Sequence, residues 1–240
     1  MPKLMRRLAY FVTAILLLMC WGWAYAAFRH GAYITVVIAL ALSVIPILIV
    51  AMTRISTAVA PGVAFDSAGT WLRPDPRIEA LMHRLVTAGI VATATVCAAW
   101  LGGVLYQGFL DEFGHMVPLL CGVTSLVLLW TWLMTKRQGG ISYLILSPDG
   151  FEFSGLLSPR VGKWDDIAAM VDDDPEAGRF WGLMDFTMTN NKRLRMESTG
   201  IYTPGGKALY EFVRFYWQHP EHRDELTNGR ALNRLESLQV

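Results

Sequence analysis

The chain has 240 residues, of which 53% are hydrophobic and 17% charged, and its formal net charge is +1. Its mean hydropathy of +0.35 is higher than that of a typical soluble domain of this length. Residues 1–138 hold 10 Lys and Arg against 5 Asp and Glu, whereas residues 139–240 hold 11 against 15, which is the reverse of a nucleic-acid binder with a basic soluble part, so that class is excluded.

Four apolar segments in the first 138 residues contain no charged side chain. They are residues 8–28, 32–52, 85–106 and 117–134. At about 1.5 Å of rise per residue each covers roughly 27–33 Å, which is enough for the ~30 Å hydrocarbon core of a bilayer. We therefore predict a four-helix transmembrane domain over residues 1–138, in which Pro46 kinks the second helix.

The first segment also resembles a signal peptide. A basic start and an apolar centre precede Ala24-Tyr25-Ala26, which has the small residues of a cleavage site. A lipoprotein signal would place a small residue before Cys20, but Met19 stands there. The apolar run is longer than a usual signal core and a second apolar segment follows at once, so we expect a retained helix.

The basic residues predict the orientation of these helices. Nine of them lie before the first segment, in residues 53–84 or directly after the fourth segment, whereas Arg29 alone lies on the opposite side. By the positive-inside rule both termini are cytoplasmic. Arg outnumbers Lys 16 to 5 in this Ala- and Val-rich chain, which is typical of a GC-rich bacterial genome. We expect a multi-pass protein of the plasma (inner) membrane of a bacterium.

The composition of the four segments bears on transport and on packing. Without a charged residue or histidine at bilayer depth they offer no proton relay or voltage sensor, and no internal repeat is present, so a stand-alone pump is disfavoured. Small residues on the third segment follow four-residue ladders, which allow helices to pack closely within the bundle or against another subunit. The two ladders are Gly89, Thr93 and Cys97, and Ala94, Ala98 and Gly102.

Residues 139–226 have the pattern of short strands followed by one helix. Alternating segments flank the turn Ser147–Gly150. Side-chain parity in the later hairpin directs Phe186, Met188, Leu194 and Met196 to one face, and Arg193 and Arg195 to solvent. A helix starting at Thr203-Pro204 and ending near Gln218 directs Leu209, Phe212, Val213 and Tyr216 to the core, with Tyr210 and Trp217 on the flank. This order predicts a small, partly open barrel closed by a helix.

The order "LILSPDGFEF", "VGKWDDIAAM" and "ALYEFVRFYWQHPEHRDEL" resembles bacterial multi-pass membrane proteins with a C-terminal pleckstrin-homology-like (PH-like) domain. In that family a W-x-D-I strand end precedes a closing helix, which runs into a P-x-x-R-x-E-L tail, matched here by Pro220, Arg223, Glu225 and Leu226. The resemblance covers about residues 140–226 and implies a PH-type fold there, followed by a tail at 227–240.

The family fold can bind phosphoinositide headgroups through a basic first hairpin, but here the corresponding turn contains Asp149 and is followed by Glu152. A phosphoinositide site is therefore disfavoured, although basic residues that converge would meet anionic membrane lipids. The candidate contacts with the leaflet or with a partner are Trp71, Arg160, Lys163, Arg193, Arg195, Tyr210 and Trp217.

No catalytic motif, metal-ligand spacing or cofactor fingerprint is evident. His219 and His222 lack a third ligand, and the acidic run 172–176 lacks the alternation of a calcium loop. Asp165 and Asp166 are adjacent, which points them in opposite directions. Cys20, Cys97 and Cys121 lie in apolar segments and are expected to be inert thiols.

Two functions remain open. The first is a non-catalytic accessory or scaffolding subunit of a membrane complex or homo-oligomer, with a cytoplasmic PH-like interaction domain. The second is a lipid-handling or small-solute membrane protein regulated by that domain. The second predicts a polar cavity at bilayer depth, which the sequence does not show.

Overall fold

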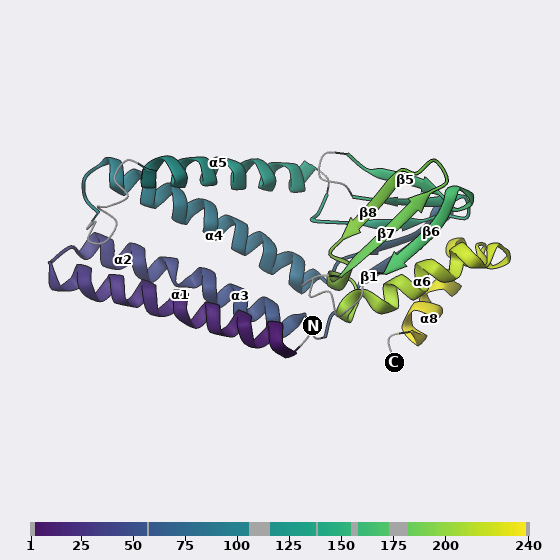
Figure 1. The fold of residues 1–240 in the computed structure, drawn as a ribbon, viewed down its shortest axis with the longest axis horizontal. Helices are drawn as coiled ribbons and strands as arrows, with labels where there is room; N and C mark the ends of the chain where they lie inside the picture. The colour runs from purple at the N-terminus through teal and green to yellow at the C-terminus, as the bar shows by residue number, and fades with distance from the viewer. Residues whose placement is uncertain are drawn as a thin grey trace. The chain divides into compact units, whose positions relative to one another are not determined.

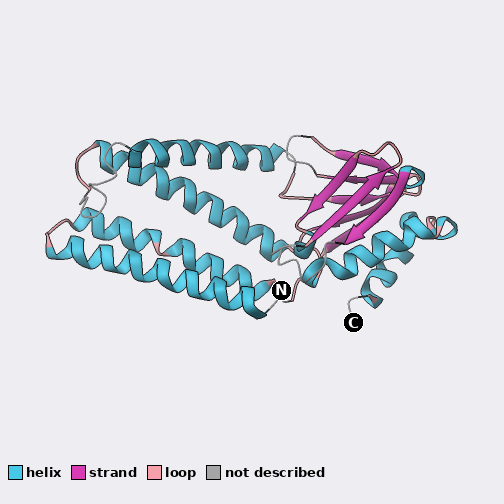
Figure 2. Cartoon of the chain, in the orientation of Figure 1, coloured by secondary structure: helices cyan, strands magenta, loops and turns pink. Residues whose placement is uncertain are grey.

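The computed structural model of the chain describes residues 3–56, 58–105, 116–137, 139–154, 158–172 and 182–238. The chain divides into two compact units. We call Arg7–Thr53 with Ala80–Arg137 the helical unit, and Met1–Arg6, Arg54–Glu79 and Gln138–Val240 the sheet unit. All strands of the described residues belong to the sheet unit (Figure 2).

The helical unit contains four helical segments that are long and apolar enough to cross a membrane, as predicted: Arg7–Arg29, Tyr33–Ile55, Pro76–Leu101 and Met116–Arg137. The elements that form them are labelled in Figure 1 and are α1 (Lys3–Arg29), α2 (Tyr33–Leu42), α3 (Val44–Ile55), α4 (Pro76–Leu101) and α5 (Met116–Arg137).

The second segment is interrupted, which separates α2 from α3. Pro46 has no N–H to donate to the carbonyl of Leu42, so the regular ladder is lost there. Ser43 ends α2, with its N–H and its hydroxyl both donating to the carbonyl of Leu40, at 3.2 and 2.6 Å. The kink expected from Pro46 is thus observed as a break at Ser43.

The third segment has bounds that differ from the expected 85–106. Asp75 begins the helix early, because its carboxylate accepts a hydrogen bond of 2.8 Å from the N–H of Arg77, and Pro76 suits the first helical position. Gly103, at φ +64°, ends the helix, and the following N–H of Val104 donates back to the carbonyl of Ala99 at 3.1 Å. Gly102 consequently lies beyond α4, and Tyr106 is outside the described residues.

The sheet unit contains a five-stranded antiparallel sheet whose first two strands come from the segment between the second and third apolar helices. No strands were predicted in that segment. The strand order is β1 (Gly62–Asp66), β2 (Gly69–Arg73), β3 (Leu144–Leu146), β4 (Gly150–Phe153) and β5 (Arg160–Lys163). The carboxylate of Asp66 holds the β1–β2 turn by accepting from the N–H groups of Ala68 and Gly69, at 2.8 and 3.1 Å.

A second, three-stranded antiparallel sheet follows, formed by β6 (Ile167–Asp172), β7 (Leu183–Met188) and β8 (Arg193–Glu197). Phe186 pairs with Leu194 and Met184 with Met196, so the side-chain parity predicted for this hairpin is confirmed. The two sheets remain separate, and no closed barrel is present among the described residues. The expected barrel is therefore observed only as two sheets and a helix.

Aromatic side chains fill the core of the sheet unit. Phe151 stacks on Phe186 at 4.4 Å between ring centroids and lies 5.5 Å from the ring of Trp164. Helix α6 (Lys207–Gln218) contributes Leu209, Phe212, Val213 and Tyr216, all fully buried as predicted. The helix begins later than Thr203-Pro204, because Gly205 and Gly206 take positive φ values of 71° and 81°.

The segment 227–240, expected to be a tail, is largely helical in the described residues. Helices α7 (Glu225–Asn228) and α8 (Arg230–Ser237) follow α6, and Leu226, Ala231 and Leu235 are buried. The domain expected at 139–226 therefore packs together with residues on both sides of it: β1 and β2 from the earlier segment, and α8 from the C-terminal end.

Candidate functional site

The two motifs that carry the PH-like resemblance contact each other. The guanidinium of Arg223 lies over the ring of Trp164 at 5.6 Å and donates a hydrogen bond of 3.0 Å to the carbonyl of Tyr216, near the end of α6. Trp164 is 1% exposed, and its Nε1–H donates to the carbonyl of Ser147 at 2.8 Å. These motif residues therefore join α6 to the start of β6, which is a structural role.

Glu225 is the centre of a buried polar cluster. Its carboxylate accepts hydrogen bonds from the guanidinium of Arg234 at 2.9–3.0 Å and from the hydroxyl of Tyr216 at 3.2 Å, and it lies 3.1 Å from Nδ1 of His222. Burial by itself would raise the pKa of Glu225, but the hydrogen bonds and charge of Arg234 hold it below its ordinary value. The cluster stabilises the packing of α7 and α8 against α6.

The same C-terminal segment contacts the β1–β2 hairpin. The hydroxyl of Thr70 donates a hydrogen bond of 2.6 Å to the carbonyl of Leu226, and both residues are fully buried. A Cβ at Gly229 would lie 2.8 Å from the ring of Phe65, so the absence of a side chain at Gly229 lets these two segments approach each other. Residues 156 positions apart in sequence are thus in direct contact.

Asp75, which sequence reasoning missed, is a second buried carboxylate, 2% exposed. It accepts hydrogen bonds from the N–H of Ala60 at 3.1 Å and from the guanidinium of Arg77 at 2.7 Å, and its own N–H donates to the carbonyl of Ile201 at 3.2 Å. Burial alone would raise the pKa of Asp75, but Arg77 and Ala60 hold it below its ordinary value. The signal that could have identified it is the Asp-Pro helix start.

The seven candidate contact residues do not form one patch. Trp71 and Lys163 lie on β2 and β5 of the larger sheet, and Arg193 and Arg195 on β8 of the smaller one. Arg160 joins the sheets by donating a hydrogen bond of 2.7 Å to the carbonyl of Arg195. Tyr210 is 9% exposed and donates to the carbonyl of Met170 at 3.3 Å, and Trp217 is half-buried on α6.

Trp71 belongs instead to a row of residues that crosses the larger sheet. The strand registers align Ala64, Trp71, Ile145, Glu152 and Val161. On the three central strands the neighbours of this row are buried in the core, so the row, which we call the outer row, lies on the opposite face of the sheet. These buried neighbours are Thr70, Leu72, Leu144, Leu146, Phe151 and Phe153. Glu152 is occupied by a 2.7 Å hydrogen bond from the hydroxyl of Tyr143, and burial together with this carboxylate raises the pKa of Tyr143 to about 12.

The two small-residue ladders of α4 differ in their surroundings. A Cβ at Gly89 would meet Leu128 of α5 at 3.0 Å, and one at Gly122 of α5 would lie 3.8 Å from the sulfur of Cys97. The first ladder thus contacts α5, and Thr93 donates its hydroxyl to the carbonyl of Gly89 at 2.8 Å. Ala94 and Ala98 of the second ladder are exposed.

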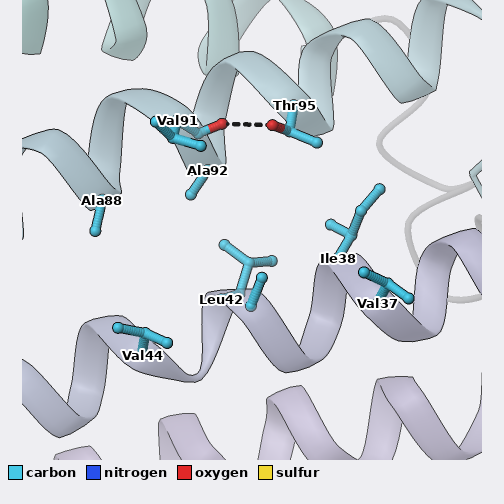
Figure 3. A pocket seen from close by; sticks show the side chains of 9 residues that line it. Val37, Ile38, Leu42, Val44, Ala88, Val91, Ala92 and Thr95 are labelled. Carbon is cyan, nitrogen blue, oxygen red and sulfur yellow. Dashed lines mark hydrogen bonds between the residues drawn. The ribbon is translucent and has the colours of Figure 1, made fainter.

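The helical unit contains a pocket that sequence reasoning also missed. Five residues of the second segment, between Val37 and Val44, and four of α4, between Ala88 and Thr95, line a volume of about 300 Å³. Ala88 and Ala92 point from α4 toward the second segment, and Leu42 points from that segment toward α4 (Figure 3). The one polar side chain of the lining, Thr95, donates its hydroxyl to the carbonyl of Val91 at 2.7 Å. We call this space the bundle pocket.

Metal-ligating residues do not gather in the parts of the chain that the structure describes: no group of three His, Cys, Asp or Glu side chains is found there. His219 lies 3.2 Å from Glu221, and His222 contacts Glu225. Asp165 is 89% exposed and lies 3.4 Å from Arg223. Residues 173–176 of the acidic run are outside the described residues.

Comparison with family models, curated proteins and solved structures finds no match for this chain. The candidate sites are therefore assessed on their geometry.

Proposed function

We propose that this protein is a non-catalytic accessory or scaffolding subunit of a bacterial membrane complex, with a PH-like cytoplasmic interaction domain. The observation that carries the proposal is the pairing of β2 with β3, which puts the segment between the second and third apolar helices into one sheet with the C-terminal part of the chain. Residues on both sides of α4 and α5 thus fold into one sheet unit, which can present a single surface to a partner.

The same pairing supports the membrane topology. Two apolar helices, α4 and α5, separate β2 from β3 in the sequence. If both cross the bilayer, the chain returns to the side on which it started, and the two strands can share a sheet. If only one of them crossed, β2 and β3 would lie on opposite sides of the bilayer. With the basic residues that precede the first segment and those of residues 53–84 on this side, the positive-inside rule makes that side cytoplasmic.

The PH-like assignment is supported by the order of the elements. Strands β3–β5 and β6–β8 form antiparallel sheets, α6 follows them, and the Trp164 and Arg223 motifs contact each other. The additional strands β1 and β2 are a departure from the resemblance, and they extend the sheet that contains the outer row.

The outer row supports partner binding. Val161 is 65% exposed, and the half-buried Trp71 and Ile145 lie on the same face, with Glu152 between Ile145 and Val161 in the row. Apolar and aromatic residues, Trp above all, supply most of the binding energy in protein interfaces. A protein partner with a complementary apolar surface is therefore the occupant we propose.

The test is co-purification of the tagged full-length protein from native membranes in mild detergent, with mass spectrometry of what accompanies it. We expect a stoichiometric partner that is lost with Val161→Glu. Val171, on β6 of the other sheet and 54% exposed, provides the matched control, and Val171→Glu is expected to retain the partner. Recovery of only this chain and lipid, or equal loss with both variants, contradicts the proposal.

A further inference from the structure

We propose that the bundle pocket binds a single hydrocarbon chain. This goes beyond the accessory role and rests only on the membrane location of the helical unit that the proposed function includes. The bundle pocket lies between interior turns of two apolar helices, and its lining residues all belong to the helical unit.

The chemistry of the lining selects the class of ligand. Eight of the nine lining residues are Ala, Val, Leu or Ile. The ninth, Thr95, directs its hydroxyl hydrogen to its own helix, since it donates to the carbonyl of Val91 (Figure 3). A polar solute would lose its hydrogen bonds to water and gain none from these side chains, which costs several kcal/mol per group. A hydrocarbon chain has no hydrogen bonds to lose on entry.

The size of the pocket fits a segment of one chain. At the ~30 Å³ that a group of the size of water occupies, 300 Å³ corresponds to on the order of ten methylene groups. An α-helix of about 10 Å diameter requires a far larger groove. The small side chains of Ala88 and Ala92 on α4, opposite the break between α2 and α3, leave this volume open.

The bundle pocket is open on one side, since Val37 and Val91 of its lining are 67% and 60% exposed. The apolar atoms of its walls gain dispersion contacts when an apolar chain lies in it. In a bilayer the molecules that surround these helices are acyl chains, so an acyl chain is at hand to make those contacts. The preference over bulk lipid comes from packing, since chain and lipid are equally apolar. The chain belongs either to a phospholipid or to a free fatty acid, which share this chemistry.

The test uses the full-length protein in lipid nanodiscs that contain a small fraction of a phospholipid with a diazirine at the middle of one acyl chain. A parallel sample contains the corresponding diazirine fatty acid. After illumination, the labelled peptides are mapped by mass spectrometry. We expect labelling to concentrate at residues 37–44 and 88–95, to saturate, and to be displaced by unlabelled chains. Labelling in the first sample identifies a phospholipid, and labelling in the second sample alone identifies a free fatty acid.

Filling the pocket provides the variant. Ala88→Leu/Ala92→Leu is expected to lower this labelling about fivefold, as the loss of on the order of ten carbon–carbon contacts implies. Ala94→Leu/Ala98→Leu, the same change at exposed positions of the same helix, is expected to leave it unchanged.

Two results overturn the inference. One is labelling spread evenly over the outward faces of the helices and insensitive to filling. The other is labelling of the wild type that does not saturate and is not displaced by unlabelled chains. This second result does not require the filled variant to fold. Neither measurement depends on a protein partner, so failure here is distinct from failure of the accessory role.

Discussion

The helical unit and the sheet unit differ in how they exclude solvent. In the sheet unit Leu72, Phe153, Phe186 and Tyr216 are each at most 1% exposed, and polar clusters join distant parts of the chain. Helix α5, in contrast, has no buried residue, and Leu126 is 67% exposed. A soluble unit must bury its apolar residues in its own core, whereas membrane helices can leave them to lipid or to another helix. The comparison identifies the sheet unit as the part that is stabilised by its own packing.

The largest expected effect is all-or-none and concerns the helical unit. Cys97 lies beside Gly122, so Gly122→Cys places a second sulfur within reach of the first after a small shift. With Cys20 and Cys121 changed to Ser, a mild oxidant should form an intramolecular disulfide, detected by a mobility shift on gels. In the control, Cys97 is also changed to Ser and the cysteine is introduced by Ala98→Cys instead. Position 98 is exposed, so this variant should not cross-link to Gly122→Cys. Absence of the Cys97 cross-link would show that α4 and α5 do not pack as described.

The next largest effect concerns the sheet unit. Leu72→Ala removes a fully buried side chain of the β1–β2 hairpin and should lower the free energy of unfolding by about 2–5 kcal/mol. The readout is thermal unfolding of the whole sheet unit, followed by limited proteolysis. Leu126→Ala on α5 is the matched control and should leave that transition in place. Equal effects of the two variants would remove the contrast between the units.

A smaller effect comes from the cluster around Glu225. Glu225→Gln removes the negative charge of the carboxylate that accepts hydrogen bonds from Arg234, whose side chain is 31% exposed. The substitution should lower the free energy of unfolding by about 1–2 kcal/mol. Glu221, whose side chain is 63% exposed, provides the control, and Glu221→Gln should unfold like the wild type.

The cluster also predicts a pH dependence. The folded-state pKa of Glu225 is lowered, so its stabilisation is present above its ordinary value of 4.5 and is lost as the pH falls through the lowered value. The pKa of Asp75 is likewise lowered, from its ordinary value of 3.8, so its stabilisation is also lost as the pH falls below that value. Unfolding temperatures measured from pH 7 to 3 should fall less steeply for Glu225→Gln than for the wild type. Parallel curves would contradict the assignment.

The smallest expected effect is local. Gly205 has φ +71° and open space around its α-carbon, so Gly205→Ala should cost only the backbone strain, about 1 kcal/mol. Gly62 has no positive φ and an ordinary contact at 3.8 Å, and Gly62→Ala should be neutral. Both are measured by the unfolding temperature of the sheet unit.

Sequence predicted those features that depend on local pattern. The four apolar helices follow from run length, and the shared face of Phe186 and Leu194 follows from strand parity. It did not predict β1 and β2, because two five-residue strands between long apolar helices carry little signal and the pairing of β2 with β3 joins distant segments. The Thr70–Leu226 contact has no local signature for the same reason.

The candidate sites were harder to predict than the fold. The bundle pocket depends on how far α4 stands from the second segment, which spacing along one helix does not determine. Ala88 and Ala92 have the same four-residue spacing as the two ladders that were identified, so sequence alone could not rank them. The ladders and the seven contact residues remain predictions about partners.

The β2–β3 pairing is tested most directly by amide hydrogen exchange of residues 69–73 in the full-length protein. β2 lies between β1 and β3, so its amides have strand partners on both sides. The account predicts exchange at least about a hundredfold slower than in an unstructured chain, comparable to β3 and β4. Exchange at the rate of an unstructured loop would contradict the shared sheet, and with it the observation that carries the proposed function.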